Sequence, residues 1–210
     1  MSDDNDTAFA RRIVETAVAL AERSDWEAVR LHAVAAEMGV GLDRIRSHFR
    51  EKDELIDAWF EHADDAVLHL ADSAGLAHLT PRQRLFSLIM AWLDALEPHR
   101  RVCRQMILAK LEPGHLHVQI PAVLRISRTV QWIREAALLE DAGLQRALTE
   151  TGVTAIYLAA FTRWLNERAA GSPATRRLLD RLLQRSEGLL RILPLARGAG
   201  AAPVRRAPGG

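Results

Sequence analysis

The chain has 210 residues, and its 28 Lys and Arg nearly balance its 27 Asp and Glu, for a formal net charge of +1. This balance excludes a chain-wide attraction to nucleic acid, so a nucleic-acid binder of this composition must concentrate its cations on one face. The single cysteine, Cys103, excludes an internal disulfide and a cysteine-rich zinc site. The acidic N-terminus is unlike a secretory signal, and no apolar run approaches the roughly 18 residues of a membrane span. We therefore expect a cytoplasmic protein.

Apolar residues recur at helical spacing through most of the chain, and no segment alternates at the two-residue period of a strand. We therefore predict an all-α fold of about nine helices. The acidic residues 1–7 are expected to be disordered, and so is the Ala-, Gly-, Pro- and Arg-rich tail at 196–210. The predicted helices cover residues 8–23, 30–38, 42–49, 53–73, 81–96, 99–111, 121–139, 144–169 and 174–193.

The stretch from Trp26 to Leu55 carries the most informative pattern. It predicts two short helices joined by a tight turn, followed by the start of a longer helix. Gly39 stands where the chain must change direction, in the position expected of a left-handed helix stop. This is the outline of a helix-turn-helix, whose second helix can enter the major groove of DNA.

The same stretch resembles the N-terminal domain of TetR-type transcriptional regulators. The residues from Met38 to Gly41 match an Ala-Gly-Val-Ser turn, those from Ile45 to Phe49 match a recognition helix ending in Tyr-x-His-Phe, and Lys52 to Leu55 match the start of the fourth helix. The resemblance implies a helix-turn-helix domain at 8–52 and a helical ligand-binding and dimerisation domain at 53–195. It further implies a homodimeric, ligand-responsive repressor that binds a double-stranded DNA operator.

Several positions that contact DNA in this family carry unusual residues here. Arg30 replaces the capping Ser or Thr, Gly41 and Leu42 replace a hydroxyl and a cation, and Arg46 replaces a tyrosine. Asp43 either faces phosphate, which would repel it, or favours the start of the recognition helix through the helix dipole. The candidate DNA-binding residues are Arg30, His32, Gly41, Leu42, Arg44, Arg46, Ser47, His48 and Lys52.

Charge near the turn is locally positive. Residues 39–52 carry four cations and two acids, whereas residues 9–55 together carry a net charge of −1. Arg44 or Arg46 could therefore contact guanine or phosphate, and Lys52 is placed for phosphate. The alternative is that these cations form only a solvated surface.

A second resemblance supports a different function. The segment from Arg163 to Leu182 is similar to the end of a ubiquinone-biosynthesis accessory protein, which has a TetR-like fold and binds lipid. The unusual residues at 41–43 and the missing tyrosine also fit such a role. The alternative hypothesis is therefore a TetR-fold protein with a degenerate DNA-binding motif that acts as a lipid- or quinone-binding accessory protein.

The C-terminal helices carry large apolar residues, most of them aromatic, on their inward stripes. Core packing is the simpler interpretation, although the family resemblance implies a cavity for a small apolar or aromatic ligand. These residues are Trp92, Met106, Trp132, Tyr157, Phe161 and Trp164. Leucines on the last helix suit a four-helix dimer interface formed by the last two helices of each copy. They are Leu178, Leu179, Leu182, Leu183, Leu189 and Leu190.

Neither catalytic nor metal chemistry is indicated by the sequence. No phosphate loop, nucleophile elbow or paired carboxylates are visible, so we expect no enzyme and no cofactor. His62 and His69 could share a helix face, and His115 and His117 form a loop pair, but neither pair has a third ligand at metal spacing.

Overall fold

The computed structural model describes residues 2–110, 128–138 and 143–192, and within these ranges the chain is helical and contains no strand. The all-α prediction is confirmed. The long elements are α1 (Ser2–Arg23), α2 (Leu31–Met38), α3 (Leu42–Arg46), α4 (Lys52–Ala71), α5 (Pro81–Leu96), α6 (Arg100–Lys110), α8 (Gly143–Leu165) and α9 (Pro173–Ile192). A further helical segment spans residues 128–136, and short 3-10 turns lie at Leu76–His78 and Glu97–His99.

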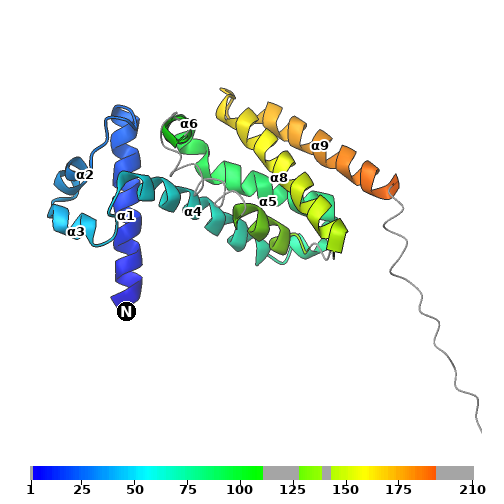
Figure 1. The fold of residues 1–210 in the computed structure, drawn as a ribbon, viewed down its shortest axis with the longest axis horizontal. Helices are drawn as coiled ribbons and strands as arrows, with labels where there is room; N and C mark the ends of the chain where they lie inside the picture. The colour runs from blue at the N-terminus through cyan, green and yellow to red at the C-terminus, as the bar shows by residue number, and fades with distance from the viewer. Residues whose placement is uncertain (1, 111–127, 139–142, 193–210) are drawn as a thin grey trace, which may run out of the picture.

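The helices form two groups. Figure 1 shows α1, α2 and α3 gathered at one end of the molecule, while α4 leaves this end and runs into a bundle with α5, α6, α8 and α9. Within the bundle, α4 packs against α5, and α9 packs against both α5 and α8. The three N-terminal helices are therefore held on the bundle through α4 and through contacts of α1 with α6.

Helix α1 begins earlier than the sequence indicated. Residues 2–7 are helical in the structure, so the expectation that 1–7 are disordered is wrong for these six positions. Asp6 lies near the start of α1, where the positive end of the helix dipole favours acidic residues. Low apolar content suggested disorder, but an acid at this position stabilises a helix N-terminus.

The starts of the bundle helices show how local sequence fixes their boundaries. Thr80 caps α5, because its Oγ1 accepts a hydrogen bond of 3.3 Å from the Gln83 amide while Gln83 Oε1 accepts one of 2.9 Å from the Thr80 amide. At α9 the cap is provided by Glu167. Its carboxylate accepts hydrogen bonds of 2.7 and 2.8 Å from the amides of Ala174 and Thr175.

Each group of helices has its own buried residues. In the N-terminal group, Ile13, Trp26, Val34 and Ile45 are at most 1% exposed, which fixes α1, α2 and α3 around one small core. Full burial of a large apolar side chain contributes about 1.5–3 kcal/mol, so these few residues suffice to fix the geometry of the turn. No described helix is both long and apolar enough to cross a membrane. The predicted tail at 196–210 and much of the predicted helix at 121–139 lie outside the described residues.

Candidate functional site

The turn between α2 and α3 has the geometry that the sequence predicted. Gly39 adopts a left-handed conformation with φ 66° and ψ 32°, and its amide donates to the Ala36 carbonyl at 3.2 Å. The next amide, that of Val40, donates back to the Ala35 carbonyl at 3.0 Å. These two bonds satisfy the last carbonyls of α2 and redirect the chain into α3. The predicted helix-turn-helix is thus present at the predicted residues.

Both helices of the motif begin without a side-chain cap. Arg30 precedes α2 in an extended conformation, and its guanidinium donates instead to the carbonyls of Glu27 and Val29. Gly41 precedes α3, and the Asp43 carboxylate folds back over it, so that a Cβ built on Gly41 would lie 2.2 Å from Asp43 Oδ1. This position matches a first-turn acid at the positive end of the helix.

Helix α3 is shorter than predicted. Regular helix ends at Arg46 rather than at Phe49, and Ser47 and His48 form the following turn. Ser47 ends the helix because its Oγ donates to the Arg44 carbonyl at 2.8 Å. Ile45 is fully buried and anchors α3. Leu42, Asp43, Arg44, Arg46 and Ser47 remain exposed on the outward surface.

His48 is not on this outward surface. Its side chain is only 9% exposed, and its ring lies 5.3 Å from the ring of Phe9 on α1. Nε2 lies 3.5 Å from Asp6 Oδ1, without the geometry of a hydrogen bond. The structure therefore places His48 in the packing between α1 and α3, away from the surface where the sequence placed it.

Lys52 also points inward. Its ammonium donates to the carbonyls of Trp26 and Glu27, at 2.5 and 3.2 Å, and lies 5.1 Å from the centre of a Trp26 ring. Burial lowers the pKa of Lys52, and nearby acids such as Glu27 only partly offset it. Lys52 therefore joins the start of α4 to the loop after α1. Its ammonium is held by backbone carbonyls and is not on the outward surface of α3, although the sequence predicted a phosphate contact for it.

The outward surface of α3 leads into an open hollow lined by Asp43, Arg46, Ser47 and Arg50. Arg46 and Arg50 are exposed, and no ion pair joins either guanidinium to another described residue. Arg50 is not among the contacts expected from the sequence. It lies beyond the end of α3, and the available signal was its place in the locally positive stretch 39–52. Arg30 and His32 are exposed at the start of α2.

The candidate ligand residues form a packed core. Trp92, Met106, Tyr157, Phe161 and Trp164 are each at most 9% exposed. The rings contact one another directly, with centroids 5.3 Å apart for both the Trp92–Tyr157 and Trp92–Phe161 pairs, in edge-to-face geometry. This arrangement fits the simpler interpretation of core packing.

Trp132 was wrongly placed on an inward stripe. Its side chain is 45% exposed, whereas Val130, Ile133 and Ala137 on the same segment are buried. At 100° per residue the buried positions fall within one arc of the helix, and position 132 falls outside it. The neighbouring Thr129 is buried and donates to Asp64 Oδ1 at 2.9 Å, which also receives the Trp92 indole N–H at 2.8 Å.

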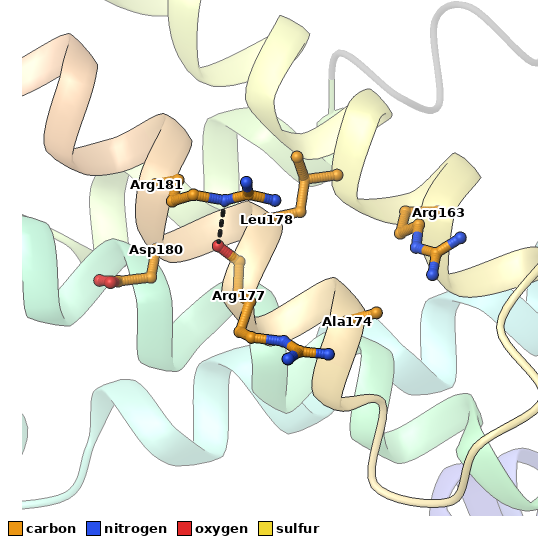
Figure 2. Close-up of a pocket in the computed structure, with 6 residues that line it drawn as sticks. All are labelled: Arg163, Ala174, Arg177, Leu178, Asp180 and Arg181. Carbon is orange, nitrogen blue, oxygen red and sulfur yellow. Dashed lines mark hydrogen bonds between the residues drawn. The ribbon is translucent and has the colours of Figure 1, made fainter.

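The leucines of α9 divide between two faces. Leu179 and Leu183 are buried within the chain's own core, so they are unavailable to a partner, contrary to the prediction. Leu178 and Leu182 remain partly exposed. Figure 2 shows Leu178 in an open hollow with Ala174 and with three arginines. The lining residues are Arg163, Ala174, Arg177, Leu178, Asp180 and Arg181. The side chains of Leu189 and Leu190 lie outside the described residues.

Other reactive groups offer little chemistry. Cys103 is buried beside Trp59, whose indole N–H points at Sγ at 3.3 Å, and burial raises the pKa of the thiol to about 12. Within the described residues, no three potential metal ligands lie close enough to share an ion. His115 and His117 lie outside those residues.

Comparison with solved structures finds chains that are similar over most of this one. One is a TetR transcriptional regulator from Nitrosomonas europaea, which is 51% identical over 86% of this chain and 99% of the other, with a TM-score of 0.77. Another is a TetR transcriptional regulator from a Rhodococcus species, 21% identical over 84% of this chain and 97% of the other, with a TM-score of 0.62, which supports the fold alone. No protein-family model and no curated protein matches the chain.

Proposed function

This chain belongs to the TetR family of transcriptional regulators, and we propose that it binds an operator in double-stranded DNA as a homodimer and represses transcription until a small apolar ligand releases it. The observation that carries the DNA contact is the outward surface of α3. It presents Arg46 with Arg50 beside it, and Arg44 on the same short helix, while Ile45 fixes their direction. Exposed guanidinium groups on a recognition helix can contact both guanine and phosphate.

The proposed interface differs from the one the sequence suggested. It comprises Arg44, Arg46, Ser47 and Arg50 around α3, with Arg30 and His32 at the start of α2. Gly41 and Leu42 contribute backbone and apolar contact at the exposed start of α3. This leaves few cations, so affinity should be modest and sensitive to salt.

A salt titration tests DNA binding. Fluorescence anisotropy with the duplex upstream of the protein's own gene should show affinity falling steeply as salt rises. Arg46→Ala should weaken binding and reduce the slope of log affinity against log salt by about one phosphate contact. Arg168→Ala is the matched control, because Arg168 is exposed in the segment between α8 and α9, outside the motif. A slope near zero for the wild-type chain would exclude the regulator and favour the lipid- or quinone-binding alternative.

The proposed dimer rests on the outward face of α8 and α9. Leu158 and Ala159 line an open hollow on α8, and Ala174 and Leu178 line the neighbouring one on α9, with Arg163 common to both. Small and apolar residues on two adjacent helices suit an isologous four-helix interface. Such a dimer would present two copies of α3 to successive half-sites about one DNA turn apart.

Mass measurement in solution tests the dimer. The wild-type chain should have twice the monomer mass in sedimentation equilibrium, and Leu178→Lys should yield a monomer by adding a buried cation beside Arg163, Arg177 and Arg181. Leu108→Lys is the control, since Leu108 is 54% exposed on α6 and outside this face. A monomeric wild-type chain, or equal effects of both substitutions, would contradict the proposed interface.

The proposed ligand site is the aromatic core around Trp92, Tyr157 and Phe161. Its rings are packed in the structure, so a ligand must bind a conformer in which they separate, and release of DNA follows if that conformer misplaces α3. Native mass spectrometry of the purified full chain should reveal a small apolar molecule that Tyr157→Ala no longer retains. Retention by that variant would place the ligand elsewhere.

A further inference from the structure

The N-terminal turns of α1 lie against the recognition helix. Asp6 Oδ1 is 3.8 Å from a terminal nitrogen of Arg44 and 3.5 Å from Nε2 of His48. Phe9, one turn further along α1, lies beneath the Arg44 guanidinium, 4.8 Å from its central carbon, and against the His48 ring. Helix α1 therefore brings both a carboxylate and an aromatic ring to a cation of the proposed DNA interface.

The Asp6 carboxylate and the Arg44 guanidinium are both exposed to solvent. The side chain of Asp6 is 59% exposed and that of Arg44 is 49% exposed, whereas that of His48 is only 9% exposed. A phosphate that approaches Arg44 competes with Asp6 for the guanidinium and also meets the negative charge of Asp6. Because phosphate neutralisation by cations provides much of the affinity for DNA, an acid at this position opposes binding to any sequence.

We infer that Asp6 restrains DNA binding by competing with phosphate for Arg44. The inference rests on the proposed DNA-binding function, and it assigns α1 a role in the interface beyond supporting α3. The expected effect is small, since an exposed ion pair contributes little, and removing the competitor should raise affinity about two- to five-fold. Being electrostatic, the gain should be equal for all DNA sequences and greatest at low salt.

The test is a double-mutant cycle on a fluorescein-labelled, mixed-sequence duplex of about 30 base pairs, measured by anisotropy at low salt. Asp6→Asn should bind about two- to five-fold more tightly than wild type. In an Arg44→Gln background the same substitution should change affinity much less, because the competed cation is gone. Asp65→Asn is the matched control: Asp65 is 50% exposed and pairs with Arg11 at 3.7 Å, outside α3.

The possible outcomes distinguish failure of this inference from failure of the proposed DNA-binding function. Wild-type binding that Asp6→Asn leaves unchanged or weakens overturns the inference and leaves DNA binding intact. A gain equal to that of Asp65→Asn, or one that persists in full without Arg44, also overturns it, because the effect would then be general charge. Absence of binding by every variant at low salt overturns the proposed function, and the inference with it.

Discussion

The backbone amide of Trp26 donates a hydrogen bond of 2.9 Å to Oε1 of Gln105, which lies 79 residues later in the chain, on α6. Arg101, one turn earlier on α6, donates to the carbonyls of Ala21 and Ser24 at the end of α1. Helix α6 thus satisfies backbone groups of the DNA-binding unit that no neighbour within that unit satisfies. A shift of α6 would act directly on the loop from which α2 begins.

Replacing Gln105 tests this connection. Gln105→Ala should lower the free energy of unfolding by about 1–2 kcal/mol, because it leaves the partly buried Trp26 amide without its acceptor. Urea unfolding followed by circular dichroism measures the loss. Gln184→Ala on the exposed face of α9 serves as control and should change stability by less than about 0.5 kcal/mol. Equal effects would show that the bond to Trp26 contributes nothing measurable.

Replacing Lys52 distinguishes a structural role for this residue from a contact with DNA. Its ammonium bonds to two carbonyls and covers Trp26, so Lys52→Met should lower the free energy of unfolding by about 1–3 kcal/mol. The salt dependence of DNA binding should stay at the wild-type slope, since Lys52 neutralises no phosphate in the proposed interface. A drop in slope as large as that of Arg46→Ala would instead assign Lys52 to the DNA contact.

These residues also show what sequence could reveal. The turn at Gly39 was predicted correctly because a helix stop is a local property of the chain. The direction of Lys52 depends on carbonyls 25 and 26 residues away, and that of His48 depends on Phe9 of another helix. Neither contact follows from the spacing of apolar and turn residues in the motif.

The same distinction explains the errors in the bundle. Periodicity placed Leu179 and Leu178 on one apolar face, but only packing against α5 decides which of the two is buried. Trp132 was misplaced for the same reason, because a short segment leaves the orientation of its buried arc open. Asp6 was missed because a carboxylate near a recognition helix has no sequence signature of its own.

Glu167 links stability to pH. Burial would raise its pKa, but hydrogen bonds from Thr175 and from the amides of Ala174 and Thr175 outweigh burial and lower it. Since the folded pKa is below the unfolded one, charged Glu167 stabilises the fold above the ordinary carboxyl range. That stabilisation is lost as pH falls from about 4.5 through the lowered folded pKa.

Glu167→Gln therefore should cost about 1–2 kcal/mol at neutral pH, through loss of the charged cap of α9, and less in acid. Urea unfolding at a series of pH values measures both the loss of stability at neutral pH and its decrease in acid. Glu15→Gln is the control, because Glu15 is exposed on α1. In this variant the free energy of unfolding should fall with decreasing pH as steeply as in the wild-type chain. If the free energy of unfolding of Glu167→Gln falls in acid as steeply as that of the wild-type chain, the Glu167 cap does not contribute to the pH dependence of stability.

The left-handed turn at Gly39 is the last test of the motif. Position 39 has φ 66° with no atom within 4 Å of a built Cβ, so Gly39→Ala introduces backbone strain without a clash and should cost about 1–2 kcal/mol. Gly39→Asn should cost less, because asparagine tolerates this conformation. Gly75→Ala is the matched control: Gly75 has equal space but φ −71°, so the substitution should be neutral or slightly stabilising. Thermal unfolding measures the stability of each variant. Equal stability changes for Gly39→Ala and Gly75→Ala would contradict the assigned turn geometry.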